Sequence, residues 1–171
     1  MSQVPVIDLS APSPEAIAAL DAACHQHGFF LLSGHGADAL IEQTWDQTSR
    51  FFDAGTDVSE PLRRTEDNPL GYFDRELTKR KRDHKQVFDF TNPTDPERDK
   101  YNRWPKNLPG FRDAMVDFHS EFTALAQRTM ALLHDVLALG PESQAKMAFN
   151  PINSPVRLNH YPVGDPVPED Q

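Results

Sequence analysis

Four short stretches of the chain carry the apolar patterns of β-strands. They are residues 4–9 (VPVIDL), 29–32 (FFLL), 86–90 (QVFDF) and 155–161 (PVRLNHY). The first suits an edge strand, because Pro5 has no backbone donor for a neighbouring strand. The second is continuously apolar, which predicts a strand buried on both faces, and the third alternates as strands do.

Three longer stretches repeat their apolar residues at helical spacing. Ser13 as N-cap and Pro14 at the first helical position begin the first helix, and Gly28 ends it. Residues 38–52 and about 108–139 predict the second and third helices, each with one buried face. The apolar face of the second consists of Leu40, Ile41, Thr44, Trp45, Thr48, Phe51 and Phe52.

The remaining segments are predicted to be mainly loops. The order of strands and helices along the chain predicts an α+β fold. Residues 53–84 are polar and poorly periodic, residues 92–109 contain four prolines, and a short helical piece follows Gly140-Pro141. The basic run 79–82 (KRKR) has the form of a nuclear address or an anion patch. In a chain of net charge −9, a solvated face is the favoured interpretation.

Composition narrows the class of protein. The 171 residues are enough for one domain, with 38% apolar and 25% charged residues. The net charge of −9 disfavours binding to nucleic acid or to an anionic membrane. Cys24 is the only cysteine, which excludes an intrachain disulfide and a Cys-rich zinc site. The sequence shows neither a leader nor a stretch of about 20 apolar residues, so a cytoplasmic protein is expected.

The histidines do not have the spacing of a complete metal site. His25 and His27, like His119 and Glu121, are two residues apart, which separates their side chains by about 200° on a helix. Both pairs are therefore expected to be surface residues rather than ligands.

The last predicted strand has one polar face. Alternation places Val156 and Leu158 on one side and Arg157, Asn159 and Tyr161 on the other. An ordinary half-buried strand turns such a face to water. Alternatively, the face lines a barrel, where a guanidinium, an amide and a phenol offer hydrogen bonds to a carboxylate ligand.

Ordered motifs along nearly the whole chain carry a family resemblance. They are VPVIDLS at 4–10, GFFLLSGHG at 28–36, Phe51-Phe52, Gly71-Tyr72, KQVFDF at 85–90, NRWPKNLPGFR at 102–112, the long helix and RLNHYP at 157–162. Together they resemble the N-terminal portion of the isopenicillin N synthase-like iron(II)/2-oxoglutarate-dependent dioxygenases. Gln86 stands where that family often has glutamate.

The resemblance implies an architecture. Residues 1–150 are expected to form the mainly helical N-terminal region, packed on the first strands of a double-stranded β-helix (jelly roll). Residues 151–171 would be its first strand and the following loop. In the family, the later jelly roll holds iron through a His-x-Asp pair and a distal histidine, and an Arg-x-Ser pair binds 2-oxoglutarate. The sequence reaches Gln171 before any of these, so neither iron(II) nor 2-oxoglutarate is expected to bind this chain alone.

The resemblance also implies chemistry. Members couple oxidative decarboxylation of 2-oxoglutarate to hydroxylation or desaturation of a small molecule with O2. The positions of Asn159 and Tyr161 contact 2-oxoglutarate or substrate in relatives. Arg157 belongs to the same motif but would equally pair with a structural acid, and His35 is expected to be structural.

Two other functions stay open from the sequence. One is an oxidase of the same superfamily that does not consume 2-oxoglutarate, like isopenicillin N synthase or aminocyclopropane-carboxylate oxidase. The other is a non-catalytic, truncated remnant that acts only as a binding module. The residues that follow Gln171 in the coding frame would separate the three.

Overall fold

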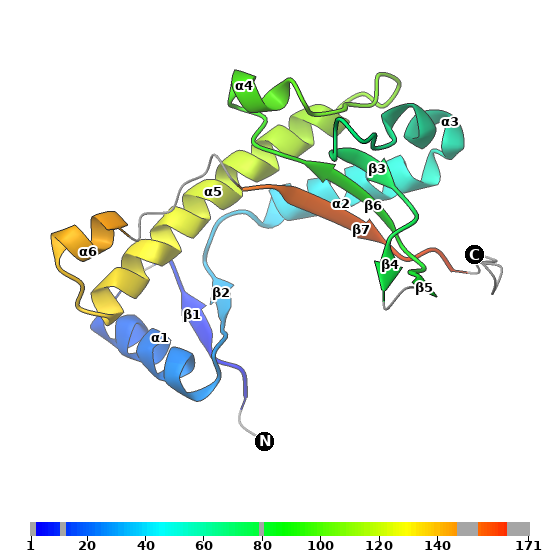
Figure 1. Ribbon diagram of the computed structural model, residues 1–171. Helices are drawn as coiled ribbons and strands as arrows, with labels where there is room; N and C mark the ends of the chain where they lie inside the picture. Colours follow the sequence, from blue (N-terminus) through cyan, green and yellow to red (C-terminus); the bar gives the residue numbers. More distant parts are fainter. Residues whose placement is uncertain (1–2, 11–12, 79–80, 147–153, 164–171) are drawn as a thin grey trace. The chain divides into compact units, whose positions relative to one another are not determined.

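Short strands and one long helix dominate the computed structural model, which describes residues 3–10, 13–78, 81–146 and 154–163 (Figure 1). In chain order the elements are β1 (Val6–Asp8), α1 (Pro14–Gln26), β2 (Leu31–Ser33), α2 (Asp38–Asp53), α3 (Thr56–Ser59), the 3-10 helix η1 (Glu60–Leu62), β3 (Gly71–Phe73), β4 (Leu77–Thr78), β5 (Lys81–Arg82), β6 (Gln86–Phe90), α4 (Pro96–Asp99), α5 (Phe111–Val136), α6 (Pro141–Lys146) and β7 (Val156–His160). Helix and strand content confirm the α+β class. No helix in the described ranges is long and apolar enough to cross a bilayer.

The chain divides into two units, residues 1–39 with 121–150 and residues 40–120 with 151–171. In the first unit, α1 begins and ends as its sequence predicts. The Ser13 hydroxyl accepts a hydrogen bond from the Ala16 amide at 3.2 Å. At the other end, Gly28 adopts a φ of +74° and donates to the Ala23 carbonyl at 3.1 Å.

The sheet of the first unit corrects the prediction for residues 29–32. Strands β1 and β2 pair in parallel, with Val6 opposite Leu31 and Ile7 opposite Leu32. Ile7 is buried, but Val6 and Leu31 are 55% and 56% exposed. The run is therefore not buried on both faces: among the described residues this sheet has two strands, and the side chains of Val6 and Leu31 are left exposed.

In the second unit, α2 lies along one face of an antiparallel sheet of strand order β3-β6-β7 (Figure 1). The Phe51 ring of α2 lies 4.9 Å from Phe88 of β6, and Phe111 at the start of α5 lies 5.5 Å from Phe88. Residues Val87 to Phe90 are all buried, because β6 is the central strand. Strand β3 lies within residues 53–84, which the sequence pattern predicted to be mostly loop.

Two side chains differ from their predicted environments. Trp45, predicted on the apolar face of α2, is 65% exposed, while Gln47 of the same helix is buried. His119, predicted at the surface, is only 4% exposed, and its Nε2 lies 3.1 Å from the Ser154 carbonyl. This contact joins α5 to the residues just before β7, and it is a long-range contact that helical geometry alone does not reveal.

Candidate functional site

The pairing of β6 with β7 determines which side chains share a face. Asp89 lies opposite Arg157, and Val87 lies opposite Asn159. Phe88 lies opposite Leu158, and both are buried in the aromatic core. The alternation predicted for the last strand is therefore confirmed from Val156 to His160.

Arg157 is held by two carboxylates. Its Nε and Nη2 donate to the two oxygens of Asp89 at 2.8 and 2.9 Å, and Nη1 lies 2.8 Å from Glu76 Oε1. The hydrogen bonds to Asp89 raise the pKa of the Arg157 guanidinium, and Glu76 adds to this. The alternative noted from the sequence, an arginine paired with structural acids, describes this arrangement.

Further ion pairs surround these carboxylates. Arg64 pairs with Asp89 and lies 3.5 Å from Glu76, and Lys85 Nζ lies 3.0 Å from Glu76. Burial raises the pKa of Glu76, but hydrogen bonding from Lys85 and the charges of Arg157, Lys85 and Arg64 outweigh burial and lower it. Glu76 thus remains ionised at neutral pH, and the contacts of Glu76 and Asp89 fix the orientation of Arg157. We call Arg64, Glu76, Lys85, Asp89 and Arg157 the ion-pair network.

Sequence reasoning missed most of this network. Asp89 carries a signal, because an acid in the middle of the apolar strand QVFDF predicts a buried ion pair with a neighbouring strand. Arg64, Glu76 and Lys85 lie in segments without periodicity, and their contacts depend on how the chain folds back.

Asn159 and Tyr161, the other two residues of the predicted polar face, lie at the C-terminal end of β7 and just after it. Asn159 is exposed beside the fully buried Val87, and Tyr161, one residue beyond β7, is 63% exposed. Within the described ranges, neither side chain has a hydrogen-bond partner. The amide of Asn159 and the phenol of Tyr161 are therefore accessible from solvent, close in sequence to an arginine that is already held in place.

His35, which was predicted to be structural, and His160 each have partners within their own unit. His35 accepts a hydrogen bond from the Ala37 amide at 3.0 Å through Nδ1, just before α2 begins. His160 lies on the opposite face of β7 from Asn159, where it stacks on Phe52 at 4.9 Å and contacts Gln86 at 3.2 Å. Its position shows that Asn159 and His160 point to opposite faces of β7.

The described side chains do not fit a metal centre. In the ranges that the structure describes, no three His, Cys, Asp or Glu side chains lie together so as to hold a metal ion. The site consists instead of hydrogen-bond donors suited to a carboxylate, so we derive no metal-dependent step from this chain's own residues.

The chain is similar to a protein family and to several characterised relatives. Residues 4–107 match the family model "non-haem dioxygenase in morphine synthesis N-terminal". A flavonol synthase/flavanone 3-hydroxylase of Matthiola incana is 29% identical over 168 residues, covering 94% of this chain and 55% of that protein. A homoarginine-6-hydroxylase of Oryza sativa subsp. japonica is 30% identical over 173 residues, covering 92% and 52%. The chain spans about half the length of the relatives that it matches.

Solved structures share the fold. The crystal structure of JOX2 in complex with 2OG, Fe and JA matches with a TM-score of 0.77 at 23% identity, covering 94% of this chain and 48% of that chain. The crystal structure of a dioxygenase for auxin oxidation in rice matches with a TM-score of 0.69 at 21% identity, covering 93% and 52%. The arrangement of helices and strands described above is therefore shared with these two proteins, the first of which was crystallised with 2OG and Fe.

Proposed function

Because this chain belongs to the non-haem dioxygenase N-terminal family, we propose that it is the N-terminal part of an iron(II)/2-oxoglutarate-dependent oxygenase. The whole enzyme would hydroxylate or desaturate a small molecule with O2. Residues 1–150 would be the N-terminal region, and residues 151–171 would begin the jelly roll. The cytoplasmic location expected from the sequence stays a prediction.

The observation that carries the proposal is the polar face of β7. Asn159 presents an amide on β7, whose other face is packed in the core, and Tyr161 carries an exposed phenol one residue after the strand. A carboxylate of 2-oxoglutarate accepts hydrogen bonds, and both side chains supply donors. We assign Asn159 and Tyr161 to binding 2-oxoglutarate or the substrate beside it.

Arg157 takes a different part in this proposal. Asp89 already accepts two hydrogen bonds from its guanidinium, and Glu76 forms an ion pair with it. A free carboxylate ligand would therefore compete with two fixed carboxylates. Arg157 acts chiefly as a positioning residue that holds β7 against β6, and so places Asn159 and Tyr161.

Iron(II), when bound by the rest of the enzyme, would activate O2 while 2-oxoglutarate supplies electrons by decarboxylation. The contribution of this chain is to bind and orient. The aromatic core under β6 and β7 makes the strand rigid, and a rigid strand holds ligand groups with little loss of entropy on binding.

The coding DNA beyond codon 171 tests the proposal. We expect an open frame that encodes a His-x-Asp pair, a distal histidine and an Arg-x-Ser pair, and a protein that converts 2-oxoglutarate to succinate with iron(II). A frame with the histidines but without Arg-x-Ser, and activity without 2-oxoglutarate, would favour the oxidase. A frame that closes without metal ligands would contradict the proposal and favour a binding module.

A further inference from the structure

A small pocket of the second unit lies where α3 and η1 meet the loop that follows α4. Its volume is about 280 Å³, and its lining includes Val58, Leu62 and Trp104 together with the charged side chains of Asp57 and Lys106. Small-molecule sites usually have volumes of about 300–1,000 Å³. The volume therefore suits a ligand at the small end of that range. We call this cavity the α3 pocket.

The floor of the α3 pocket is apolar. Leu62 belongs to the buried aromatic core, and Val58 and Trp104 pack against that core. The indole ring of Trp104 lies 5.3 Å from the ring of Phe90, and its Nε1 already donates to Asp99 at 2.9 Å. Because the indole N–H has its partner, the ring offers only apolar surface to the pocket. The apolar body of a ligand would lose contact with water here.

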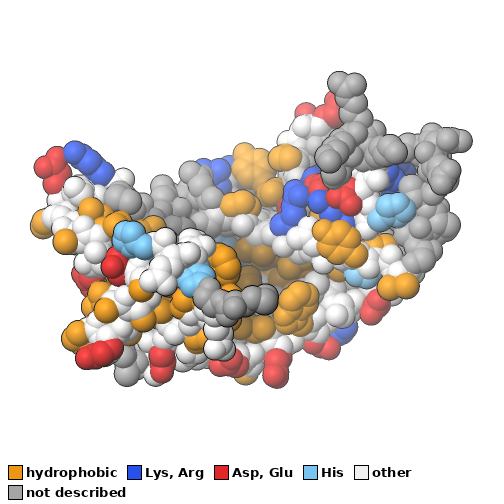
Figure 2. Space-filling model, turned by 90° about the horizontal axis from the view of Figure 1, so that it is seen from below, with side chains coloured by type: hydrophobic (Ala, Val, Ile, Leu, Met, Phe, Trp, Pro, Cys, Tyr) orange, Lys and Arg blue, Asp and Glu red, His pale blue; other side chains and the backbone are white. Residues whose placement is uncertain are grey.

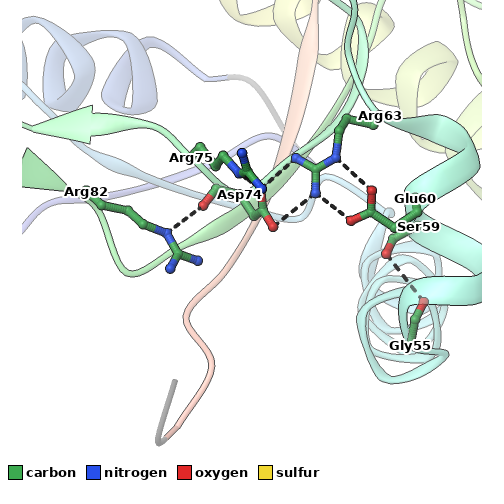
Figure 3. Close-up of polar contacts among 7 residues, drawn as sticks. All are labelled: Gly55, Ser59, Glu60, Arg63, Asp74, Arg75 and Arg82. Carbon is green, nitrogen blue, oxygen red and sulfur yellow. Dashed lines mark hydrogen bonds and ion pairs between the residues drawn. The ribbon is translucent and has the colours of Figure 1, made fainter. Parts of the chain in front are cut away.

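Polar contacts hold the α3 and η1 side of the pocket in place. The Ser59 hydroxyl donates to the Gly55 carbonyl at 3.3 Å (Figure 3). Arg63, directly after η1, donates to Glu60 at 2.8 Å and to Asp74 at 2.6 Å (Figure 3). These contacts tie both short helices to the segment after β3. The wall is therefore formed before a ligand arrives, which lowers the entropy lost on binding.

Two opposite charges line the pocket and lack partners. Asp57 lies in α3, and Lys106 lies two residues after Trp104. Among the residues that the structure describes, neither side chain forms an ion pair or a hydrogen bond, with each other or with a third group. The other charge beside Trp104, Arg112, is paired with Asp99 at 2.8 Å. A carboxylate and an ammonium group are thus both available to a ligand.

This combination selects for a ligand with two charges. A ligand with one charge is attracted by one of the two side chains and repelled by the other, whereas a zwitterion is attracted by both. The apolar floor adds affinity for a hydrocarbon body, which inorganic ions do not have. A free amino acid with an apolar side chain combines these three properties.

We propose that the α3 pocket binds a free apolar amino acid, with its carboxylate on Lys106 and its ammonium group on Asp57. The pocket is separate from the face of β7. The chain just after η1 lies against β3, where the Arg64 amide donates to the Tyr72 carbonyl at 3.0 Å, and β3 and β7 are at opposite edges of the sheet. The inference therefore does not depend on the proposed function.

Equilibrium dialysis of the complete protein against radiolabelled L-phenylalanine tests the pocket. We expect saturable binding, and weaker binding of two analogues with the same ring. 3-Phenylpropionate lacks the ammonium group and phenethylamine lacks the carboxylate, so each loses one exposed charge pair. Such a pair is worth up to about fivefold in affinity.

Two variants assign each charge to its partner. Lys106→Gln should weaken the binding of phenylalanine about fivefold without weakening that of phenethylamine. Asp57→Asn should weaken phenylalanine similarly without weakening 3-phenylpropionate. The matched controls are Lys146→Gln and Asp117→Asn, which change exposed side chains on α6 and α5 and should leave all three affinities unchanged. The melting temperatures of the variants verify folding.

Three results would overturn the inference. The first is the absence of saturable phenylalanine binding, and the second is equal affinity in the wild type and in either pocket variant. The third is binding of 3-phenylpropionate or phenethylamine as tight as that of phenylalanine, which would show that the pocket does not recognise both charges. The dialysis needs no iron, 2-oxoglutarate or turnover, so its outcome is separate from the succinate formation that tests the proposed function.

Discussion

Asp89, whose side chain is only 12% exposed, pairs with two arginines, Arg64 and Arg157. Taking a carboxylate out of water costs free energy unless hydrogen bonds and opposite charge compensate it. Loss of either arginine leaves that compensation incomplete. The ion-pair network therefore stabilises the sheet as well as orienting the candidate site.

Replacing Arg157 with methionine is expected to lower the free energy of unfolding by roughly 1–2 kcal/mol. The expected value is less than for a fully buried pair, because the Arg157 side chain is 42% exposed and Arg64 still pairs with Asp89. Arg50→Met, on the exposed side of α2, should change it by less than about 0.5 kcal/mol. Urea denaturation measures the free energy of unfolding of both variants. An equal loss in Arg157→Met and Arg50→Met would show that Arg157 contributes nothing to the stability of the sheet.

His119 gives a pH-dependent prediction at the residue scale. Burial lowers its pKa from the ordinary value of 6.5. Below pH 6.5 the unfolded chain therefore binds a proton that the folded chain does not, and stability falls until pH reaches the lowered pKa. The melting temperature of the wild type should exceed that of His119→Gln by less at pH 5.5 than at pH 7.5. A difference that is constant with pH, or that grows on acidification, would contradict this sign.

At the level of elements, the sequence is most informative where the signal is local. The Ser13 cap, the Pro14 start and the Gly28 end of α1 each depend on neighbouring residues, and all three are confirmed. Strand β3 has only three residues, and its pairing with β6 is non-local, so no periodicity marks it. Of the two partners of Arg157, Asp89 carries a sequence signal, but Glu76 could not be predicted, because it lies in a segment without regular pattern.

Gly71, at the start of β3, lies close to the backbone of Leu62, and a substitution there tests this packing. Its φ is +102°, and a Cβ there would meet the Leu62 carbonyl oxygen. Gly71→Ala is expected to destabilise the protein by about 3 kcal/mol or more, because backbone strain and overpacking add. Gly28→Ala should cost only about 1–2 kcal/mol, since φ is +74° but nothing lies within 4 Å. Equal losses in denaturant unfolding would refute the close packing of β3 against Leu62.

For the molecule as a whole, exposed apolar surface is the feature that favours self-association. Phe29, Leu31 and Val6 are each more than half exposed. Hydrophobic side chains are visible across the face shown in Figure 2, beside basic and acidic groups. Among the strands that the structure describes, β7 is in addition an edge strand of its sheet. Open apolar faces and unpaired strand edges are templates for association.

The 171-residue chain by itself is therefore expected to self-associate. Light scattering should show an average mass that rises with concentration, and Leu31→Lys should reduce this rise by placing a charge on the open face of β1 and β2. Leu137→Lys, at a residue that is 54% exposed just after α5, is the matched control. A monomer at all concentrations with cooperative melting would contradict the prediction.

The affinity for 2-oxoglutarate tests the role of the β7 face most directly. In the complete oxygenase, Tyr161→Phe removes one hydroxyl and keeps the ring, so folding should change little. Loss of a hydrogen bond to a charged ligand is worth about 1.5–3 kcal/mol, and the Michaelis constant for 2-oxoglutarate should rise roughly 10- to 150-fold. Tyr101→Phe, at a residue that is 48% exposed and remote from β7 in sequence, should leave the constant unchanged. An unchanged constant in Tyr161→Phe, or a loss of melting temperature that explains the whole effect, would contradict the assignment.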